Sequence, residues 1–491
     1  MKIAMVSPEM VPFAKTGGLA DVAGALPKYL AAQGVECLCF LPYYKRVREG
    51  EFDVKDTGIE VEIPLGERRA KGRIFETVLP GAEARVYLVA NDEFFYRDEL
   101  YGTPEGDYPD NASRFIFFAR AVAETLAVLG EDVSVVHCHD WQTALLPVYL
   151  KTLYRDKVPG SPGTLLTIHN LAYQGSFWHW DMKLTGLSWE LFNWRQLEFY
   201  GKLNFLKGGI VFADALNTVS PTYAREIQTP ELGCGLEEVL RFRSDRLFGI
   251  INGIDYDVWN PKTDPLIPYH YDARSTSGKK KDKLALQKEA GLDPDPKKPL
   301  IGMISRLAAQ KGLDIIAGML DELAREDVQL VFLGTGDKHY QDLLAEFGAK
   351  HPGKVSANIR FDNRFAHLIE AGSDMFLMPS RYEPCGLNQL YSLKYGTVPI
   401  VRRTGGLADT ITDATPETIA DGTATGVVFE PYTSEALLGA VRRALKLYAD
   451  GKTWRRIMRA GMKQDWSWAR SAREYADLYR RVKAWSDGQA T

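Results

Sequence analysis

Short apolar runs alternate with longer amphipathic stretches along most of the chain. In the first half, the apolar runs predict strands over residues 2–7, 35–41, 84–90, 133–137, 164–169 and 213–220. Between them, apolar residues recur at helical spacing, most regularly over residues 111–129, where Gly130 supplies a stop signal. Strands that alternate with helices in this way indicate a parallel sheet with helices on its faces.

The alternation stops near the middle of the chain and then resumes. A turn pattern around residues 248–254 precedes a stretch rich in Pro, Asp, Lys, Ser and Tyr, which is typical of a domain boundary. Beyond it, strands are predicted over residues 300–305, 329–333, 374–378, 398–401 and 426–429, and a helix is predicted after Thr433. We therefore expect two similar α/β domains, over residues 1–253 and 254–464, with a ligand cleft between them and a terminal helix within residues 465–491.

Composition narrows the class of protein. With 45% apolar and 25% charged residues the chain is close to globular averages. Its net charge of −4 is not the positive charge expected of a nucleic-acid-binding protein. The chain has no run of about 18 apolar residues, and its first apolar run is shorter than a signal-peptide core. Its five cysteines lack the density of a disulfide scaffold. We therefore expect a cytoplasmic protein with neither a nucleic-acid nor a membrane partner.

A glycine-rich turn follows the first predicted strand. Lys15 precedes Gly17 and Gly18, and residues 16–22 recur almost unchanged as residues 404–410, after another predicted strand. Paired glycines let the backbone approach a ligand closely, and the first N–H groups of the following helix attract anions. Either turn alone is also compatible with a plain strand-to-helix connection and a solvated lysine. The two copies predict an anion-binding turn in each domain.

Two cations, Arg306 and Lys311, follow the strand predicted over residues 300–305. Cations at the beginning of a helix are electrostatically unfavourable, because that end carries a partial positive charge. A diphosphate ligand would explain them, since a guanidinium and an ammonium together can stabilise a phosphate leaving group. The alternative is a helix whose first turn happens to be basic.

Glu383 lies in a loop between Pro379 and Pro384, after the strand predicted over residues 374–378. Because the prolines restrict this loop, we expect the carboxylate to accept hydrogen bonds from sugar hydroxyls rather than to be merely solvated. The neighbouring Cys385 has no histidine nearby in sequence, which disfavours a nucleophilic thiol.

Histidines cluster at the end of the strand predicted over residues 133–137. We expect His137 and Cys138 on opposite faces of the strand, and no second Cys/His pair completes a metal site. His139 and Asp140 are expected in the loop beyond the strand, where they would hydrogen-bond a polar ligand.

Other polar patterns have more than one interpretation. His169 and Asn170 close another predicted strand and also suit a polar ligand, although His169 is equally compatible with a core position. The D-x-D patterns in residues 255–257 and 293–295 fall in turn-rich segments, so we interpret them as turn formers. The basic run over residues 279–283 is interpreted as a solvated helix face. The absence of a G-x-G-x-x-G sequence disfavours an NAD-dependent dehydrogenase.

Aromatic residues are dense between Tyr173 and Tyr200. They comprise Phe177, Trp178, Trp180, Trp189, Phe192, Trp194 and Phe199. Core packing explains some of these rings. Rings interleaved with polar side chains also suit stacking on sugar faces, and this segment follows the His169 loop directly.

Eight short motifs occur in order over residues 15–21, 137–141, 167–170, 219–223, 252–255, 305–311, 383–387 and 404–406. This set resembles the bacterial glycogen synthases and plant starch synthases of glycosyltransferase family 5, over nearly the whole chain. The resemblance implies a GT-B fold, in which two Rossmann-like domains face each other across a cleft and the last helix crosses back to the first domain. It also implies that the first domain is the glucan acceptor side and the second binds the nucleotide-sugar donor.

The resemblance implies a retaining enzyme that transfers glucose from ADP-glucose to the nonreducing end of an α-1,4-glucan, without a metal or a cofactor. The implied catalytic residues are Lys15, His169, Arg306, Lys311 and Glu383. The implied substrate-binding residues are Gly18, Asp21, His139, Asn170, Asn252, Cys385, Gly386, Leu387, Thr404, Gly405 and Gly406. Wider relatives carry a second glutamate eight positions after the first, where this chain has Tyr391, as the starch-synthase branch does.

The implied roles divide between the two domains. Lys15 and Gly18 would contact the donor phosphate and glucose, and His169 would lie beside the reacting carbon. Residues 404–406 would add backbone donors to the phosphate. Domain closure on donor binding is therefore expected. The alternatives are a phosphorylase-like enzyme with a lysine-bound pyridoxal phosphate and a catalytically inactive glucan-binding protein.

Overall fold

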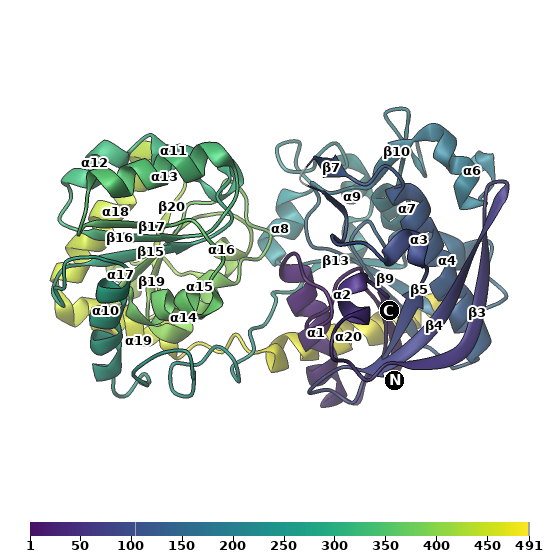
Figure 1. Cartoon of the computed structure of the whole chain (residues 1–491), viewed down its shortest axis with the longest axis horizontal. Coiled ribbons are helices and arrows are strands. Elements are labelled where there is room, and N and C mark those ends of the chain that lie inside the picture. Colours follow the sequence, from purple (N-terminus) through teal and green to yellow (C-terminus); the bar gives the residue numbers. More distant parts are fainter. Residues whose placement is uncertain (104, 490–491) are drawn as a thin grey trace. The chain divides into compact units, whose positions relative to one another are not determined.

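The computed structural model describes residues 1–103 and 105–489 and divides into two compact units (Figure 1). Unit 1 comprises Met1–Gly253 and the chain from Trp468 onward, and unit 2 comprises Ile254–Ser467. Each unit contains a mostly parallel sheet, so the predicted α/β class with two domains is confirmed. Of the terminal segment expected over residues 465–491, residues 490 and 491 lie outside the described residues.

Unit 1 is built on a nine-stranded sheet in the order β14-β13-β9-β8-β1-β2-β5-β4-β3. Its strands are β1 (Lys2–Val6), β2 (Glu36–Pro42), β3 (Lys55–Leu65), β4 (Arg68–Val78), β5 (Arg85–Ala90), β8 (Val135–His139), β9 (Gly163–Ile168), β13 (Ala215–Thr218) and β14 (Leu247–Gly249). The six strands predicted for this half correspond to β1, β2, β5, β8, β9 and β13. All six are almost continuously buried, as strands of a parallel sheet covered on both faces must be.

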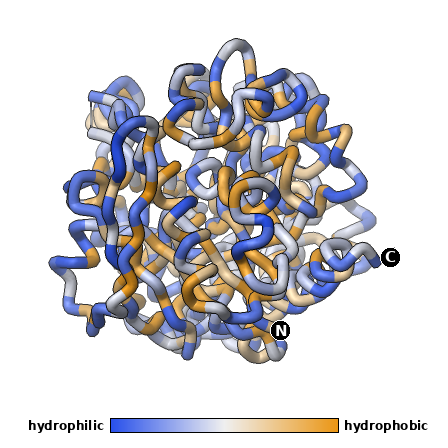
Figure 2. Tube along the Cα trace, turned by 90° about the vertical axis from the view of Figure 1, so that its right-hand side faces the viewer, coloured by the Kyte–Doolittle hydropathy of each residue, from blue (hydrophilic) through white to orange (hydrophobic). Residues whose placement is uncertain are grey.

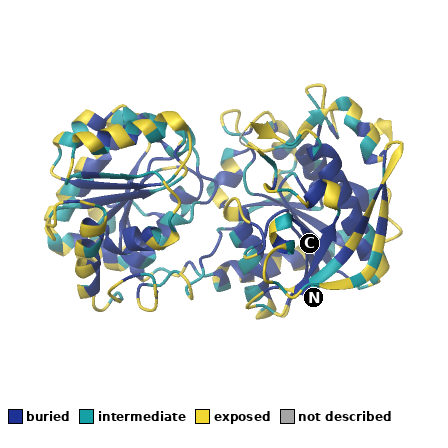
Figure 3. Ribbon diagram, viewed as in Figure 1, coloured by how far each residue is buried: buried dark blue, intermediate teal, exposed yellow. Residues whose placement is uncertain are grey.

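The edge hairpin of β3 and β4 is not predicted by the sequence analysis. These strands pair antiparallel at the edge of the sheet, and their residues alternate between exposed and buried, as the changing colours along them in Figure 3 show. An alternating strand contains no continuous apolar run, so the pattern that identifies the parallel strands misses it. The strand β14 is also missed, and it has only three residues, all of them partly buried.

Helices cover the sheet of unit 1. The main ones are α1 (Gly18–Ala31), α4 (Asn111–Leu129), α5 (Leu145–Lys151), α7 (Phe205–Phe212), α8 (Pro221–Glu226) and α9 (Glu237–Phe242). Shorter helical turns are α2 (Lys45–Arg48), α3 (Asp92–Phe95) and α6 (Met182–Thr185), and a small three-stranded sheet contains β10 (Ser176–Trp178), β12 (Lys202–Asn204) and β11 (Glu198–Phe199). The helix predicted over residues 111–129 is confirmed as α4. It ends at Gly130, whose φ of 64° is left-handed.

The last helix, α20 (Trp468–Ser486), returns to unit 1, as predicted, and packs on α1 and β9. The approach to β9 is close, because a Cβ placed on Gly163 would lie 2.8 Å from the Val482 side chain. A buried polar contact fixes the helix further. The His137 ring nitrogens lie 2.8 Å from the Tyr479 hydroxyl and 2.7 Å from the Thr167 hydroxyl, and burial lowers the pKa of His137 to about 3.

Unit 2 is built on a six-stranded parallel sheet in the order β17-β16-β15-β18-β19-β20. Its strands are β15 (Leu300–Ile304), β16 (Gln329–Leu333), β17 (Val355–Asn358), β18 (Met375–Met378), β19 (Val398–Arg402) and β20 (Val427–Phe429). The five strands predicted for this half are confirmed, and β17, which is only partly buried, is the one missed.

Helices pack against this second sheet. They are α10 (Ser277–Glu289), α11 (Leu313–Ala317), α12 (Leu320–Arg325), α13 (Lys338–Lys350), α14 (Asn363–Gly372), α15 (Asn388–Tyr395), α16 (Gly405–Thr410), α17 (Pro416–Asp421), α18 (Ser434–Ala449) and α19 (Gly451–Met462). The helix predicted after Thr433 is α18. The whole chain is coloured by hydropathy in Figure 2, where hydrophilic residues form much of the outline of the trace.

The basic run at the start of α10 is not the solvated face that was predicted. Lys279 and Lys283 are buried, whereas Lys280 and Lys281 are exposed. The Lys279 ammonium donates to the carbonyl of Ala371 at 3.0 Å, and the Lys283 ammonium lies 2.6 Å from an Asp374 carboxylate oxygen. Lys279 therefore faces the end of α14, where carbonyl groups and partial negative charge favour cations, whereas Lys283 pairs with Asp374, which follows that helix.

We predict that Tyr479→Phe destabilises unit 1 without changing its fold. The substitution leaves a nitrogen of the buried His137 ring without its partner, which costs about 1–3 kcal/mol. Urea unfolding followed by circular dichroism should show a lower midpoint. Arg480→Ala, at an exposed position of the same helix, is the control and should unfold like the unsubstituted protein. An equal midpoint for Tyr479→Phe and the control would contradict the prediction.

Candidate functional site

In each unit, some of the predicted site residues follow the strands at which the strand order reverses: Lys15 follows β1, and Arg306 and Glu383 follow β15 and β18. In unit 1, β1 has β2 on one side and β8 on the other, and in unit 2, β15 has β16 on one side and β18 on the other. Ligands of open α/β sheets bind beyond the carboxyl ends of the strands at such points. Each unit therefore presents its polar loops at the position where a ligand is expected.

The glycine turn after β1 is held by a carboxylate that the sequence analysis missed. The buried side chain of Glu9 accepts hydrogen bonds from the N–H groups of Thr16 and Gly17 at 2.5 and 3.2 Å. It also accepts from the hydroxyls of Thr16 and Tyr101 at 2.6 and 2.7 Å. Four donors thus fix the loop that precedes α1. The sequence feature that could have identified Glu9 is an acidic residue within a buried segment.

The space beside Gly17 is open. A Cβ placed on this residue would meet no atom within 4 Å, and its φ of −151° is available to any residue. Packing within unit 1 therefore does not require glycine there, whereas close approach of a ligand would. Gly17 is the N-cap of α1 and supplies no side-chain acceptor for the first N–H groups of the helix. The predicted site residue Gly18 begins the helix and is exposed.

The two charged residues predicted at this turn lie together. The Lys15 ammonium contacts both carboxylate oxygens of Asp21, at 2.7 and 2.8 Å. Both side chains are partly exposed, and an exposed ion pair contributes only about 0–1 kcal/mol. The ion pair therefore holds the Lys15 side chain only weakly.

The predicted loop position of His139 is wrong, because β8 extends to this residue and buries it completely. Its ring lies 2.9 Å from the ring of His169, which follows β9 and is partly exposed. Desolvation lowers the pKa of His169 to about 3 and the pKa of His139 well below its usual value. Both rings are therefore neutral near pH 7. His139 supports His169 from beneath and is itself shielded from a ligand.

Asp140 fixes the backbone at His169. Its carboxylate accepts the His169 N–H at 2.7 Å, and its own φ of 55° is left-handed. Burial raises the pKa of Asp140 to about 7, although the backbone donors oppose this shift. A strained residue with a perturbed acid group at a strand end is typical of a functional site.

The two predicted asparagines of unit 1 have different settings. Asn170 is partly exposed, and its side chain accepts the Ala172 N–H at 3.1 Å within its own turn. Asn252 is buried next to Gly253, at the connection to unit 2, and its Oδ1 atom has no hydrogen-bond partner among the described residues. A Cβ on Gly253 would lie 2.4 Å from the Cα atom of Trp468, so the two connecting segments cross there in close contact.

In unit 2, Lys311 and Glu383 form an ion pair. The Lys311 ammonium lies 2.7 and 2.9 Å from the two oxygens of Glu383, and Ser380 donates to the same carboxylate at 2.9 Å. Glu383 is only 5% exposed. Separate roles for the two residues were predicted, and their direct pairing was not. Lys311 comes from the loop after β15 and Glu383 from the loop after β18. The pair therefore joins the two strands between which the strand order reverses, which we call the switch point of unit 2.

Arg306 differs from Lys311 in its surroundings. Its side chain is exposed, and its guanidinium donates to the neutral amide of Gln310 at 3.1 Å. Its charge is thus available to an anion at the carboxyl edge of β15. The predicted pair of cations is present, with Lys311 compensating a buried carboxylate and Arg306 facing solvent.

The second glycine turn does not have the open geometry of the first. A Cβ on Gly405 would lie 1.9 Å from the Glu383 carbonyl oxygen, and one on Gly406 would lie 2.0 Å from the Cys385 carbonyl oxygen. The Gly406 N–H already donates to the carbonyl of Glu383 at 3.1 Å, and the Thr404 N–H donates to Arg402 at 3.0 Å. These two N–H groups therefore have acceptors within unit 2, and the role of residues 404–406 as phosphate donors stays a prediction. The turn also supports the loop that carries Glu383.

The remaining predicted residues of this loop are organised by Gln389, which was not predicted. Its amide donates to the carbonyls of Cys385 and Gly386 at 2.9 and 3.0 Å. Cys385 is buried, Gly386 has a left-handed φ of 72°, and Leu387 is the N-cap of α15. The loop therefore has one fixed path from Glu383 into α15.

A stack of three rings lies beside α15. Trp259 is stacked between His367 and Tyr391, with ring centroids 3.8 and 3.9 Å apart. Tyr391 is the residue that replaces the second glutamate of wider relatives. The sequence analysis missed Trp259 because this residue lies in the irregular segment after the domain boundary.

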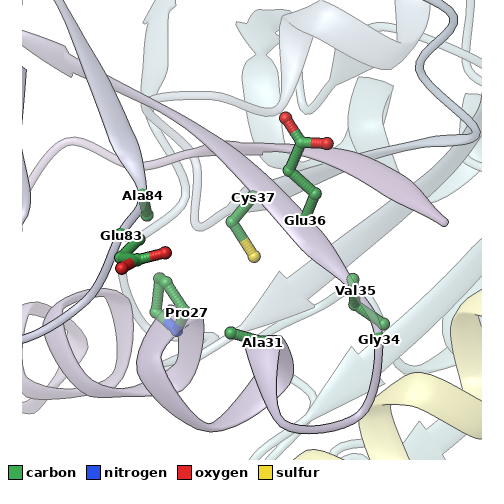
Figure 4. A pocket seen from close by; sticks show the side chains of 8 residues that line it. All are labelled: Pro27, Ala31, Gly34, Val35, Glu36, Cys37, Glu83 and Ala84. Carbon is green, nitrogen blue, oxygen red and sulfur yellow. The ribbon is translucent and has the colours of Figure 1, made fainter.

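Two cavities of unit 1 lie away from the predicted residues. One, of about 280 Å³, is lined by the end of α1, the start of β2 and the segment before β5, including Pro27, Cys37 and Glu83 (Figure 4). The other, of about 870 Å³, lies beside the β3–β4 hairpin.

Within the described residues, no group of three or more His, Cys, Asp and Glu side chains could hold a metal ion. None of the described helices is long and apolar enough to cross a membrane.

Comparison with known proteins identifies the class. Residues 2–242 match the family described as "Starch synthase catalytic domain", and residues 287–464 match "Glycosyl transferases group 1". The fold is similar to that of the catalytic domain of starch synthase IV from Arabidopsis thaliana bound to ADP and acarbose, with a TM-score of 0.90 and 33% identity over 98% of this chain and 99% of that chain. Two Rossmann-like units with these matches define a glycosyltransferase of the GT-B fold.

Whole-chain relatives narrow this class. The chain is 49% identical over 481 residues to glycogen synthase 2 of Geobacter sulfurreducens, covering 98% of both chains. It is 48% identical over 490 residues to the glycogen synthase of Thermotoga maritima, covering 99% of both chains. The chain belongs to the glycogen synthase and starch synthase family. The predicted resemblance and the predicted enzyme class are confirmed.

We predict that Gly406→Ala lowers kcat about 10²-fold, because the new methyl group must push the Glu383 loop out of place and misplacement of a site by about 1 Å has an effect of that size. The measurement is steady-state glucose transfer at saturating donor. Gly439→Ala is the matched control, since this exposed helical glycine has no atom within 4 Å of the added carbon. It should retain full activity. Equal activity of the two variants would refute the supporting role of the second glycine turn.

Proposed function

We propose that the protein transfers glucose from ADP-glucose to the nonreducing end of an α-1,4-glucan with retention of configuration, without a metal or a cofactor. The observation that carries this proposal is the buried Glu383–Lys311 pair at the switch point of unit 2. The names of the whole-chain relatives and the ADP and acarbose bound to the Arabidopsis enzyme support it. Unit 2 is the donor side and unit 1 the acceptor side.

The donor's glucose and diphosphate are assigned to the residues of unit 2. Glu383, held by Lys311 and Ser380, accepts hydrogen bonds from glucose hydroxyls, and its loop continues through Cys385 and Gly386. The exposed guanidinium of Arg306 binds the diphosphate, whose negative charge grows as the glycosidic bond breaks. The remaining N–H of the Lys311 ammonium stabilises the same charge, so one lysine links sugar recognition to departure of the leaving group.

The acceptor side and the reacting carbon are assigned to the residues of unit 1. The neutral ring of His169, supported by His139 and Asp140, lies beside the reacting carbon without adding a charge. Lys15 leaves Asp21 to bind the donor phosphate, and the open space at Gly17, beside the exposed Gly18, admits the donor. Asn170 and the buried Asn252 complete the polar lining. A cytoplasmic location remains a prediction from the sequence.

We predict that Arg306→Ala and Lys311→Ala each lower kcat about 10²–10³-fold with a smaller effect on KM, because each removes a positive charge that acts mainly in the transition state. Lys311→Ala should also lower the melting temperature, since Glu383 is left buried without its cation. Lys338→Ala, an exposed lysine paired with Asp342, is the control. Near-normal kcat in both site variants would refute the assignment.

The donor prediction is tested by glucose incorporation into glycogen with ADP-glucose and UDP-glucose side by side. We expect the higher kcat/KM with ADP-glucose, and no loss of activity in the presence of a metal chelator. A higher value with UDP-glucose would overturn the donor assignment. Release of glucose 1-phosphate from glycogen and phosphate, with the absorbance of bound pyridoxal phosphate, would instead identify a phosphorylase-like enzyme.

A further inference from the structure

The helix α15 determines where the proposed sugar-binding loop ends. This loop runs from Glu383 to Leu387, the N-cap of α15, and Gln389 in the first turn of the helix donates to the carbonyls of Cys385 and Gly386. A shift of α15 would therefore move the loop. The helix has only eight residues, and so short a helix has no fixed position without its neighbours. The contacts that hold α15 therefore also hold the loop.

One face of α15 contacts the chain that follows the domain boundary. Tyr391, Lys394 and Tyr395 lie at helical spacing and share this face. Each of the three contacts a different residue of the segment over residues 254–264, which we call the boundary segment. Three contacts along one face fix both the position and the rotation of the helix.

The first contact is a stack of rings with Trp259 of the boundary segment at its centre. Its ring lies between those of His367 and Tyr391, at interplanar angles of 13° and 8°. His367 belongs to α14, so the stack joins α14 to α15, which lie side by side in Figure 1. Trp259 and Tyr391 are only partly buried, so filling of the core does not account for the stack. The central ring determines the distance between the outer two.

The second contact involves a cation. The Lys394 ammonium lies 4.0 Å from the centroid of the Tyr256 ring, whose face attracts it. Tyr256 is itself fixed, since its hydroxyl accepts the N–H of Trp466 at 2.9 Å. The N–H of Ile254 also donates to the carbonyl of Trp466, at 2.8 Å. The boundary segment is thus anchored to the chain after α19, independently of α15.

The third contact is a buried carboxylate. Asp264 is 1% exposed and accepts hydrogen bonds from the Tyr395 hydroxyl and, at 2.8 Å, from the Leu266 N–H. The Nδ1 atom of His367 also lies 2.8 Å from this carboxylate. Although burial opposes the charged form, the hydrogen bonds from His367 and Tyr395 keep the pKa of Asp264 below its usual value. A buried carboxylate requires these partners in place, so it holds α15 against the boundary segment.

We propose that Trp259 is a positioning residue for the donor's glucose. From the boundary segment it holds α15 at the place where Gln389 and the Glu383 loop can bind the sugar. This inference rests on the proposed function, because that function assigns the donor's glucose to Glu383. ADP carries no glucose, so its binding depends on Arg306 and not on the Glu383 loop. Binding of ADP-glucose depends on both.

The test measures the affinity of Trp259→Ala for ADP and for ADP-glucose, by isothermal titration calorimetry without glucan. We expect binding of ADP-glucose to weaken about tenfold, which is less than the roughly 10²-fold effect of a 1 Å misplacement on catalysis, because α14 and α19 still support α15. Binding of ADP should not change. The kcat/KM for ADP-glucose should fall by a similar factor, and KM for glycogen should not change. Trp259→Phe keeps a flat ring and should recover most of the loss.

Two further variants separate positioning from general stability. Phe347→Ala is the matched control, because it removes a buried ring that meets His351 edge to face at 5.0 Å at the end of α13, away from α14 and α15. It should lower the melting temperature and leave both affinities unchanged. Tyr391→Ala removes an outer ring of the stack at a partly exposed position, and it should reproduce the selective loss of ADP-glucose binding.

Other results would overturn the proposal. Equal weakening of ADP and ADP-glucose binding in Trp259→Ala would show that the stack supports unit 2 as a whole. Unchanged affinities, or a Trp259→Phe variant as weak as Trp259→Ala, would also refute the positioning role. If the unsubstituted protein transfers no glucose from either donor, the proposed function fails. A selective loss of ADP-glucose binding in the variants would still support the role of Trp259.

Discussion

The buried ion pair between Glu383 and Lys311 is the interaction on which the site loops of unit 2 depend. A carboxylate that is almost completely removed from water requires a nearby cation, and loss of one partner of such a pair commonly costs about 3–5 kcal/mol. The pair also determines where the loops after β15 and β18 run, because their charged side chains must meet. The glycines of α16 and the amide of Gln389 then fix the backbone of the Glu383 loop from the other side.

The two copies of the glycine heptad show that one sequence can serve two physical purposes. In the first copy, the N–H groups of the turn donate to the side chain of Glu9, and the space beside Gly17 is empty. In the second copy, a turn N–H donates to a main-chain carbonyl, and no room remains for a Cβ on Gly405 or Gly406. Glycine thus leaves open space in unit 1 and admits another loop of the protein in unit 2.

Much of the fold could be predicted because buried parallel strands form continuous apolar runs, whereas β3 and β4 alternate and are missed. Parallel strands also bring Arg306 and Glu383 to the same edge, so their loops could be placed by sequence. The residues that pair with those side chains could not be predicted from the sequence. Pairing of Lys311 with Glu383 joins residues 72 positions apart. Burial of Lys279 depends on where α14 ends, and neither relation leaves a local pattern.

The return of α20 to unit 1 determines the order in which the newly made chain can fold. Unit 2 ends at Ser467, so all of its residues have been synthesised before those of α20. The core of unit 1 includes Tyr475, Tyr479 and Val482, and the strands that they cover are made hundreds of residues earlier. The first unit to be translated is therefore the last to be completed. Until α20 has left the ribosome, an apolar face of the first sheet stays open to water and to chaperones.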